Sequence, residues 1–191
     1  NVHSWNVRDQ HMMSTLDRLL DFHGKDSKAI VWAHNTHVGD ARATDMSHAG
    51  MYNIGELARV ESKEKGVYLI GFGSYKGTVV AGKKWGGEIN KMEMPPAQPG
   101  SWEDLLHLSN KEESLLLMKN FMDDLFIAHH FGHRAIGVVY NPSLESYGNY
   151  VPTILPLRYD AFIYIEHTNA LRPLHIKPDG HQIPETYPFG I

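Results

Sequence analysis

Segments with a helical apolar period alternate along this chain with short, continuous apolar runs. The helical patterns cover Arg8–His23 and Met51–Lys65, and each is followed by a glycine, the residue that most often ends a helix. The apolar runs predict buried strands at Lys28–Ala33, Val67–Phe72, Ala135–Tyr140 and Ala161–Ile165. This alternation predicts an α/β fold with a central, mostly parallel sheet flanked by helices.

Turn and capping signals organise the middle of the chain. Six of the 17 glycines lie in Gly71–Gly87, which predicts a hairpin or an irregular edge around the apolar run Thr78–Ala81. Three prolines predict a loop over Met92–Gly100. Two residue pairs have the spacing of helix N-caps, Ser101 with Asp104 and Asn110 with Glu113. The helix after the second pair is predicted to be long, with apolar positions as far as Leu125 and an end near Gly132.

The richest chemistry lies in AIVWAHNTHVGDAR, Ala29–Arg42, where a predicted strand runs into polar side chains. Such a cluster at the carboxyl end of a strand is typical of α/β active sites. In a turn, His34 and His37 can converge on one small volume and bind a substrate oxygen, a water or a metal. The alternative is that one is a hydrogen-bonded core histidine and the other is merely exposed. The pattern favours an enzyme.

Neighbouring polar residues have competing interpretations. Asp40 can pair with Arg42 or orient a histidine, and a surface ion pair or a turn is the simpler reading. The helix dipole explains Asp9 near a helix start, but it does not explain Arg8, which is therefore a candidate ligand for an anion or oxyanion. The HHFGH segment, His129 to His133, is expected to complement the carbonyl end of the predicted long helix rather than to bind a metal.

Composition narrows the class of protein. With 191 residues and 42% hydrophobic content, the chain has enough apolar material for one globular domain. A formal charge of −4 without a basic cluster argues against nucleic-acid binding. There is no cysteine, so a metal would have to rest on the 13 histidines and the carboxylates, and two histidines alone are a weak metal signal. Because no apolar run approaches the roughly 20 residues of a membrane span, we expect a soluble, cytoplasmic protein without a membrane partner.

Several segments together resemble the erythromycin esterase family, in the right order and at similar intervals from Trp5 to about Leu174. They are SWNVRDQHM at Ser4–Met12, VWAHNTHVGDAR at Val31–Arg42, GVYLIGF at Gly66–Phe72, HRAIGVVYNP at His133–Pro142 and RYDAFIYIEHTNALRPL at Arg158–Leu174.

The resemblance implies a hydrolase of carboxylic esters that uses histidine-activated water. Some family members open the macrolide lactone ring and so give antibiotic resistance. Family members lack a nucleophilic serine, and no GxSxG motif is present here. The HNxH block maps the active site onto His34 and His37, which would position water or substrate and stabilise the oxyanion. The substrate-binding candidates are Arg8, Asn35 and Asp40. Because some relatives carry a succinoglycan-biosynthesis label, the small-molecule ester could instead belong to a polysaccharide or a metabolite.

The family also carries a further His-and-Glu motif, with the proposed general base, upstream of the segment where this chain begins. We therefore expect the 191 residues to correspond to the carboxyl-terminal portion of an erythromycin-esterase-like domain. Three alternatives stay open: a binding protein that keeps the pocket without the chemistry, a hydrolase in which His34, His37 and an upstream carboxylate hold a divalent metal, and a metal-stabilised module. No other cofactor is predicted.

Overall fold

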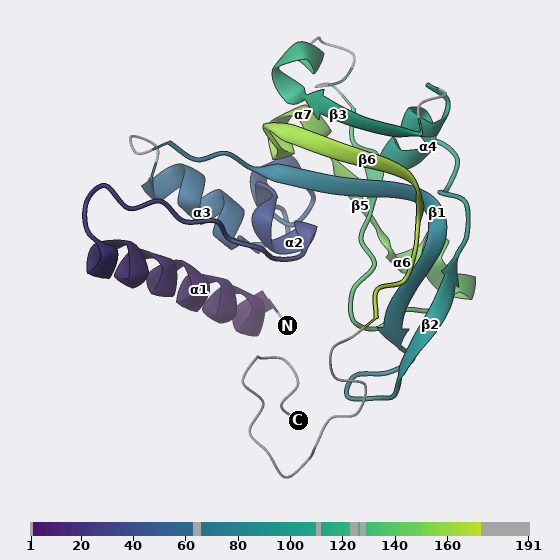
Figure 1. The fold of residues 1–191 in the computed structure, drawn as a ribbon, viewed down its shortest axis with the longest axis horizontal. Coiled ribbons are helices and arrows are strands. Elements are labelled where there is room, and N and C mark those ends of the chain that lie inside the picture. The colour runs from purple at the N-terminus through teal and green to yellow at the C-terminus, as the bar shows by residue number, and fades with distance from the viewer. Residues whose placement is uncertain (1, 63–65, 110–111, 123–125, 127–128, 173–191) are drawn as a thin grey trace.

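A four-stranded mixed sheet forms the centre of the fold (Figure 1). The computed structural model describes residues 2–62, 66–109, 112–122, 126 and 129–172. The strand order is β2-β1-β6-β3, with β1 at Ile70–Gly82, β2 at Ile89–Met94, β3 at Glu113–Leu117 and β6 at Ala161–Thr168. Only β1 and β6 pair in parallel, while β1–β2 and β3–β6 are antiparallel. The α/β class is confirmed, but the prediction of a mostly parallel sheet is wrong.

The long strand β1 changes partner at Gly77. Up to this residue it pairs with β6, and from this residue to Gly82 it forms a hairpin with β2. Gly77 has φ +138°, and a Cβ there would lie 2.1 Å from the Thr168 carbonyl oxygen, so only glycine fits. The predicted hairpin is confirmed. The predicted loop begins later than expected, at Pro95, because Met92 and Met94 belong to β2.

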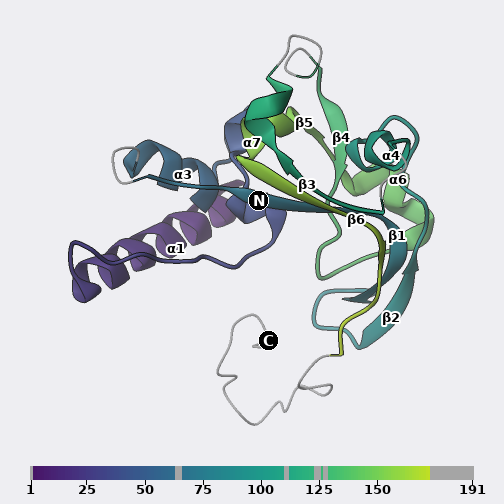
Figure 2. The same ribbon diagram turned by 45° about the horizontal axis from the view of Figure 1, so that its top comes forward.

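Three helices lie beside the amino-terminal half of β1 (Figures 1 and 2). They are α1 at Val2–His23, the single turn α2 at Asn35–Val38 and α3 at Ile54–Glu61. The two predicted helices are confirmed, the first longer and the second shorter than expected; residues 63–65 lie outside the described residues. Helix α3 packs against both α1 and α2, and α2 also contacts β1. In the part of the chain that the structure describes, no helix combines the length and apolar character required to cross a membrane.

A two-stranded antiparallel sheet and several short helical turns complete the fold (Figure 2). The strands are β4 at Phe131–Arg134 and β5 at Tyr150–Thr153. The α-helical pieces are α4 at Trp102–His107, α6 at Glu145–Gly148 and α7 at Leu155–Arg158, and 3-10 turns lie at Ala41–Ala43, Met118–Phe121 and Pro142–Leu144. The predicted cap of α4 is confirmed, since Ser101 Oγ accepts the Asp104 N–H at 3.2 Å.

Two of the four predicted strands are wrong. Lys28–Ala33 forms no strand, because a strand needs a hydrogen-bonding neighbour and the edge of β1 at Phe72 is occupied by the Asn35 side chain. Ile30 and Trp32 in this segment are accordingly 94% and 86% exposed. Ala135–Tyr140 is mostly irregular, with one bridge between Val139 and Gly82; the strand lies just before it, at β4.

The predicted long helix is also wrong over the described residues. Glu113–Leu117 is strand β3, and Met118–Phe121 is a 3-10 turn. Pairing with β6 sets Leu116 opposite Phe162, so the apolar residues pack in a sheet rather than on a helix face. Asn110 and Leu125, on which that prediction also depended, lie outside the described residues.

An aromatic core connects the sheet to α4 and α7. Its buried members are Leu69, Trp102, Met118, Leu155, Tyr159, Phe162 and Tyr164. Glycine is required where Tyr159 crosses β1, because a Cβ on Gly71 would lie 2.6 Å from its ring. The same ring lies close to Gly39, the residue after the polar turn Asn35–Val38, because a Cβ there would be 2.8 Å from Tyr159 Cε1.

We expect Gly71→Ala to lower the free energy of unfolding by about 1–3 kcal/mol, because the added methyl group forces a fully buried ring to move. Urea denaturation measures this change. Gly137→Ala is the matched control, since a Cβ at position 137 meets no atom within 4 Å. Equal effects of the two substitutions would contradict this account of the packing.

Candidate active site

The turn that carries the HNTH sequence is stabilised by the first histidine itself. His34 is the N-cap of α2, and its Nδ1 accepts the Thr36 N–H at 3.2 Å and lies 2.9 Å from Thr36 Oγ1. Its Nε2 lies 2.9 Å from the Ile136 carbonyl oxygen. Because a carbonyl only accepts, Nε2 carries the hydrogen and Nδ1 is the acceptor. Both ring nitrogens of His34 are thus bonded to the protein.

The protein holds His34 in its neutral form. His34 is exposed to solvent on one side, and the protein around the rest of the ring lowers its pKa below the ordinary value of 6.5, chiefly by desolvation. The hydrogen bond to Ile136 acts in the opposite direction. The Arg158 charge lowers the pKa further, as do His37 and His133 when they are protonated. At neutral pH the imidazole is therefore uncharged.

This lowered pKa makes stability depend on pH. Between pH 6.5 and the lower folded-state pKa, the unfolded chain binds the His34 proton and the folded chain does not, so the free energy of unfolding falls as the pH falls through this window. We expect His34→Asn, which can still cap the helix, to reduce this slope in urea denaturation between pH 7 and pH 5. His48→Asn, at an exposed histidine, is the control. An unchanged slope in the His34 variant would contradict the assignment.

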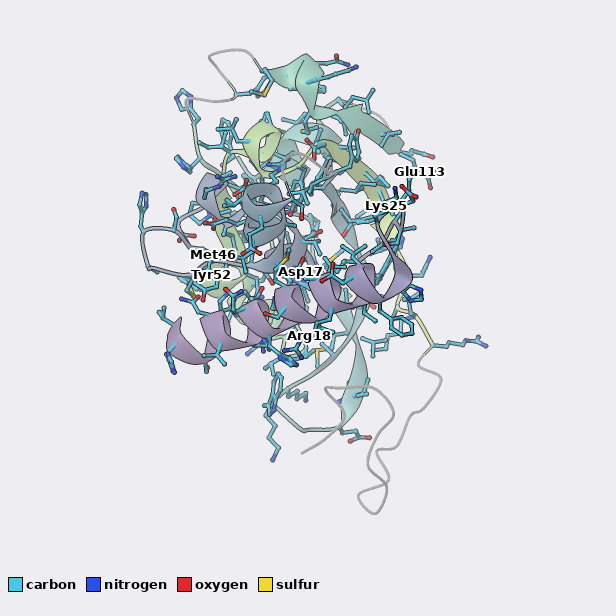
Figure 3. All side chains as sticks on the ribbon, turned by 90° about the vertical axis from the view of Figure 1, so that its left-hand side faces the viewer. Asp17, Arg18, Lys25, Met46, Tyr52 and Glu113 are labelled. Carbon is cyan, nitrogen blue, oxygen red and sulfur yellow. The ribbon has the colours of Figure 1, made fainter. Side chains whose placement is uncertain are left out.

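His37 is bound by two side chains of α1. Asp9, which is fully buried, places its two carboxylate oxygens 3.0 and 2.9 Å from His37 Nδ1. Trp5 stacks on the imidazole with ring centroids 4.5 Å apart and an angle of 6°. Trp5 and Asp9 are four residues apart and so lie on one face of the helix. The Trp5 indole N–H donates to the carbonyl oxygen of Tyr52, which lies beside the amino-terminal half of α1 (Figure 3).

The hydrogen bonds of Asp9 define which nitrogen of His37 carries the hydrogen in the neutral ring. Asp9 Oδ2 also accepts the Ile54 N–H at 3.1 Å, so the carboxylate is an acceptor on every side. His37 Nδ1 must then carry the hydrogen, which leaves Nε2 of the neutral ring as an acceptor. Within the described residues Nε2 makes no hydrogen bond, and the side chain is 18% exposed. The neutral His37 ring is therefore held in one orientation, with Nε2 available as an acceptor.

The predicted substrate ligand Arg8 lies on the same helix. Its guanidinium carbon is 4.9 Å from the Trp5 ring centroid, its Nε is 4.0 Å from Asp9 Oδ1, and its side chain is 41% exposed. Arg8 and His37 thus both contact the Trp5 ring. No contact tests the predicted role of Arg8 as an anion ligand, which stays a prediction.

The other two predicted ligands already have protein partners. The Asn35 amide donates to the Phe72 carbonyl at 2.6 Å and accepts the Phe72 N–H at 3.2 Å, as a neighbouring strand would. Asp40 pairs with Arg42 at 2.7 Å and Arg59 at 3.2 Å, which confirms the predicted pairing with Arg42. Although burial raises the pKa of Asp40, the hydrogen bonds from these arginines lower it overall, so the carboxylate is charged. Substrate contacts of Asn35 and Asp40 stay predictions.

A second histidine–carboxylate pair lies beneath the turn, and sequence reasoning missed it. His133 Nδ1 is 2.6 Å from Glu103 Oε1, and both side chains are fully buried. His133 Nε2 lies 3.4 Å from both Asn35 Nδ2 and the Tyr159 hydroxyl. Burial raises the pKa of Tyr159 to about 12, so that hydroxyl stays protonated.

The expectation that His133 complements a helix end is thus wrong, because it lies on strand β4. Among the described residues, no three histidine, aspartate or glutamate side chains come close enough together to hold a metal ion.

Solved structures with a similar fold cover most of this chain. A succinoglycan biosynthesis protein is 19% identical, with a TM-score of 0.59 over 74% of this chain and 33% of that chain. A Bacillus cereus protein is 19% identical, with a TM-score of 0.56 over 73% and 33%. A mutant of the erythromycin esterase EreC in its open conformation is 18% identical, with a TM-score of 0.59 over 85% and 37%. This chain thus spans about a third of the length of the solved structures it matches.

The sequence itself matches a family model along most of its length. The model describes erythromycin esterase and covers residues 1–168, which include α1, the HNTH turn and both histidine–carboxylate pairs. On this match, the chain belongs to the erythromycin esterase family.

Proposed function

We propose that this protein hydrolyses a carboxylic ester with water that is activated by the Asp9–His37 pair. The observation that carries the proposal is the bond from His37 Nδ1 to the buried Asp9 carboxylate, which leaves Nε2 as a free acceptor. A general base needs this arrangement: an acceptor nitrogen held in position and a carboxylate that stabilises the imidazolium formed after proton transfer. Asp9 supplies the carboxylate, which the resemblance did not assign. The proposal thus gives His37 the role of general base, in place of the upstream residue to which the resemblance assigns that role.

The proposed reaction needs one water and no covalent enzyme intermediate. His37 Nε2 removes a proton from water as the water oxygen bonds to the ester carbonyl carbon, giving a tetrahedral oxyanion. The C–O bond to the alcohol then breaks, and the proton on Nε2 passes to the leaving alkoxide. The products are a carboxylic acid and an alcohol, and the neutral imidazole is restored.

The two histidines of the HNTH turn have different parts in this proposal. His34 has both nitrogens bonded within the protein, so it shapes the turn that carries His37. Arg8 is assigned to bind negative charge on the substrate, because its exposed guanidinium lies over the Trp5 ring that covers His37.

The substrate class is proposed from the family and its solved members. The names erythromycin esterase and succinoglycan biosynthesis protein suggest two kinds of ester, a macrolide lactone and an ester on a polysaccharide. We favour the macrolide lactone, because the family model that matches residues 1–168 is described by that activity.

Release of nitrophenolate from 4-nitrophenyl acetate, followed with and without EDTA, tests the reaction class. The proposal predicts release above the buffer rate that persists in the chelator, because the proton is taken by an imidazole. Loss of activity in EDTA would favour the metal-dependent hydrolase. Binding of the ester, measured by calorimetry without product formation, would favour the binding protein.

A further inference from the structure

Arg158 is a buried cation at the end of α7. Its side chain is fully buried. Its Nη1 donates to Thr153 Oγ1 at 2.9 Å, and its Nη2 donates to the Asn35 carbonyl oxygen at 3.2 Å. The Nε has no hydrogen-bond partner, and among the described residues it is the one buried side-chain nitrogen or oxygen in that condition. The guanidinium thus lies directly beneath the HNTH turn.

Other arginines near the site are paired with acids. Arg134, which is also buried, lies 2.7 Å from Glu145, and Arg59 bridges Asp40 and Asp160. Arg158 makes no ion pair with any described carboxylate. Burying an unpaired charge is costly, so a positive charge kept in this position needs a reason.

The fold is built closely around this guanidinium. A Cβ on Gly39 would lie 2.6 Å from Arg158 Nε, so the residue that ends the turn must be small. The backbone of the next residue, Asp40, donates its N–H to the Arg158 carbonyl at 3.0 Å. On the other side, the Tyr159 ring centroid lies 5.4 Å from the guanidinium carbon. The turn and Arg158 are therefore packed as one unit.

We infer that Arg158 is a positioning residue of the histidine site. Its guanidinium, which has no carboxylate partner among the described residues, anchors the Asn35–Val38 turn and places positive electrostatic potential next to it. Its anchoring contact is with the Asn35 carbonyl, one residue after His34 and two before His37. The charge itself acts without moving, as a preorganised source of potential for negative charge that forms at the site.

The ionisable groups that act on the pKa of His34 support this inference. They are His37 on its own turn, His133 on β4 and Arg158 on α7. The nearby carboxylates of Asp9 and Glu103 are engaged at Nδ1 of His37 and of His133. Arg158 is the permanent charge of this set, and it contributes to the lowered pKa of His34.

Titration of His34 by NMR tests the charge directly, without any substrate. Isotope-labelled chain is titrated as the parent and as Arg158→Gln, with the His34 signal assigned through His34→Asn. We expect the pKa of His34 to rise in Arg158→Gln, which keeps hydrogen-bond donors but loses the charge. Arg134→Gln is the matched control, a buried arginine that does not act on His34, and we expect no such rise there. A folded Arg158→Gln with an unchanged His34 titration overturns the inference.

Arg158→Lys keeps the inference testable where the glutamine variant does not fold. Lysine retains the charge and loses the planar fork, so His34 is expected to titrate as in the parent. A raised His34 pKa in a folded Arg158→Lys, which keeps the charge, would contradict a charge effect.

The kinetic consequence rests on the proposed function. Loss of a residue that positions an active-site group commonly lowers activity about 10- to 100-fold. We expect Arg158→Gln to lower kcat by about this factor, with little change in KM. If the parent hydrolyses no ester, the proposed function fails, while the NMR titration still decides the inference.

Discussion

Replacing His37 with alanine is expected to lower kcat for ester hydrolysis by about 10²- to 10⁴-fold, the usual contribution of a general base. His37 is the described histidine with one nitrogen on a buried carboxylate and the other without a hydrogen bond. His34 cannot replace it as the base, because both of its nitrogens are already bonded to the protein. The loss should fall on kcat more than on KM, since the proton moves only in the transition state.

Steady-state rates with 4-nitrophenyl acetate measure this loss. His11→Ala, at an exposed histidine of α1, is the control and should keep the parental rate. Because alanine leaves space beneath Trp5, added imidazole should restore part of the lost rate. A His37→Ala variant that is folded and retains the parental kcat would remove His37 from the chemistry.

Asp9→Asn is expected to cost about 10³- to 10⁴-fold in kcat, as in hydrolases whose buried aspartate fixes a histidine tautomer. An asparagine at this position can donate its amide N–H to His37 Nδ1, which forces the hydrogen onto Nε2. The ring would then be a donor where the reaction needs an acceptor. The amide oxygen can still accept the Ile54 N–H, so the fold should tolerate the change.

Asp17→Asn is the matched control for this variant. Asp17 lies two turns further along α1 (Figure 3) and, unlike Asp9, is not fully buried. It should leave kcat unchanged, and neither substitution should alter KM strongly. Equal rates for the parent and Asp9→Asn would mean that the carboxylate only secures α1 to the rest of the fold.

The elements that the sequence predicted well are those stabilised by local signals. Helix α1 has an apolar stripe and a terminal glycine, α4 has the Ser101 cap, and the β1–β2 hairpin has its glycines. The errors arose where a partner distant in sequence decides the structure. Lys28–Ala33 has the composition of a strand but no neighbouring strand to pair with, and Glu113–Leu117 pairs with β6 although its apolar residues also suit a helix.

In the candidate site too, the part predicted from the sequence depends on local signals, and the part that was missed depends on contacts between distant segments. The HNTH turn was found because polar residues directly follow an apolar run. Its supports were not found, because they come from α1, α4 and β4. The attribution of Asp9 to the helix dipole is wrong, because α1 begins at Val2 and Asp9 is not in its first turn. Nothing local shows that Asp9 meets His37, 28 residues later. The four-residue spacing of Trp5 and Asp9 is the signal that could have suggested a functional helix face. Glu103 and His133 are 30 residues apart and meet only through the fold.

The most direct test of the central claim is mass spectrometry of erythromycin after incubation with the 191-residue chain and with its His37→Ala variant. The account predicts that the parent converts the macrolide to a product heavier by one water and that the variant leaves the macrolide unchanged. The same product formed at the same rate by His37→Ala would contradict the claim that the Asp9–His37 pair activates the water.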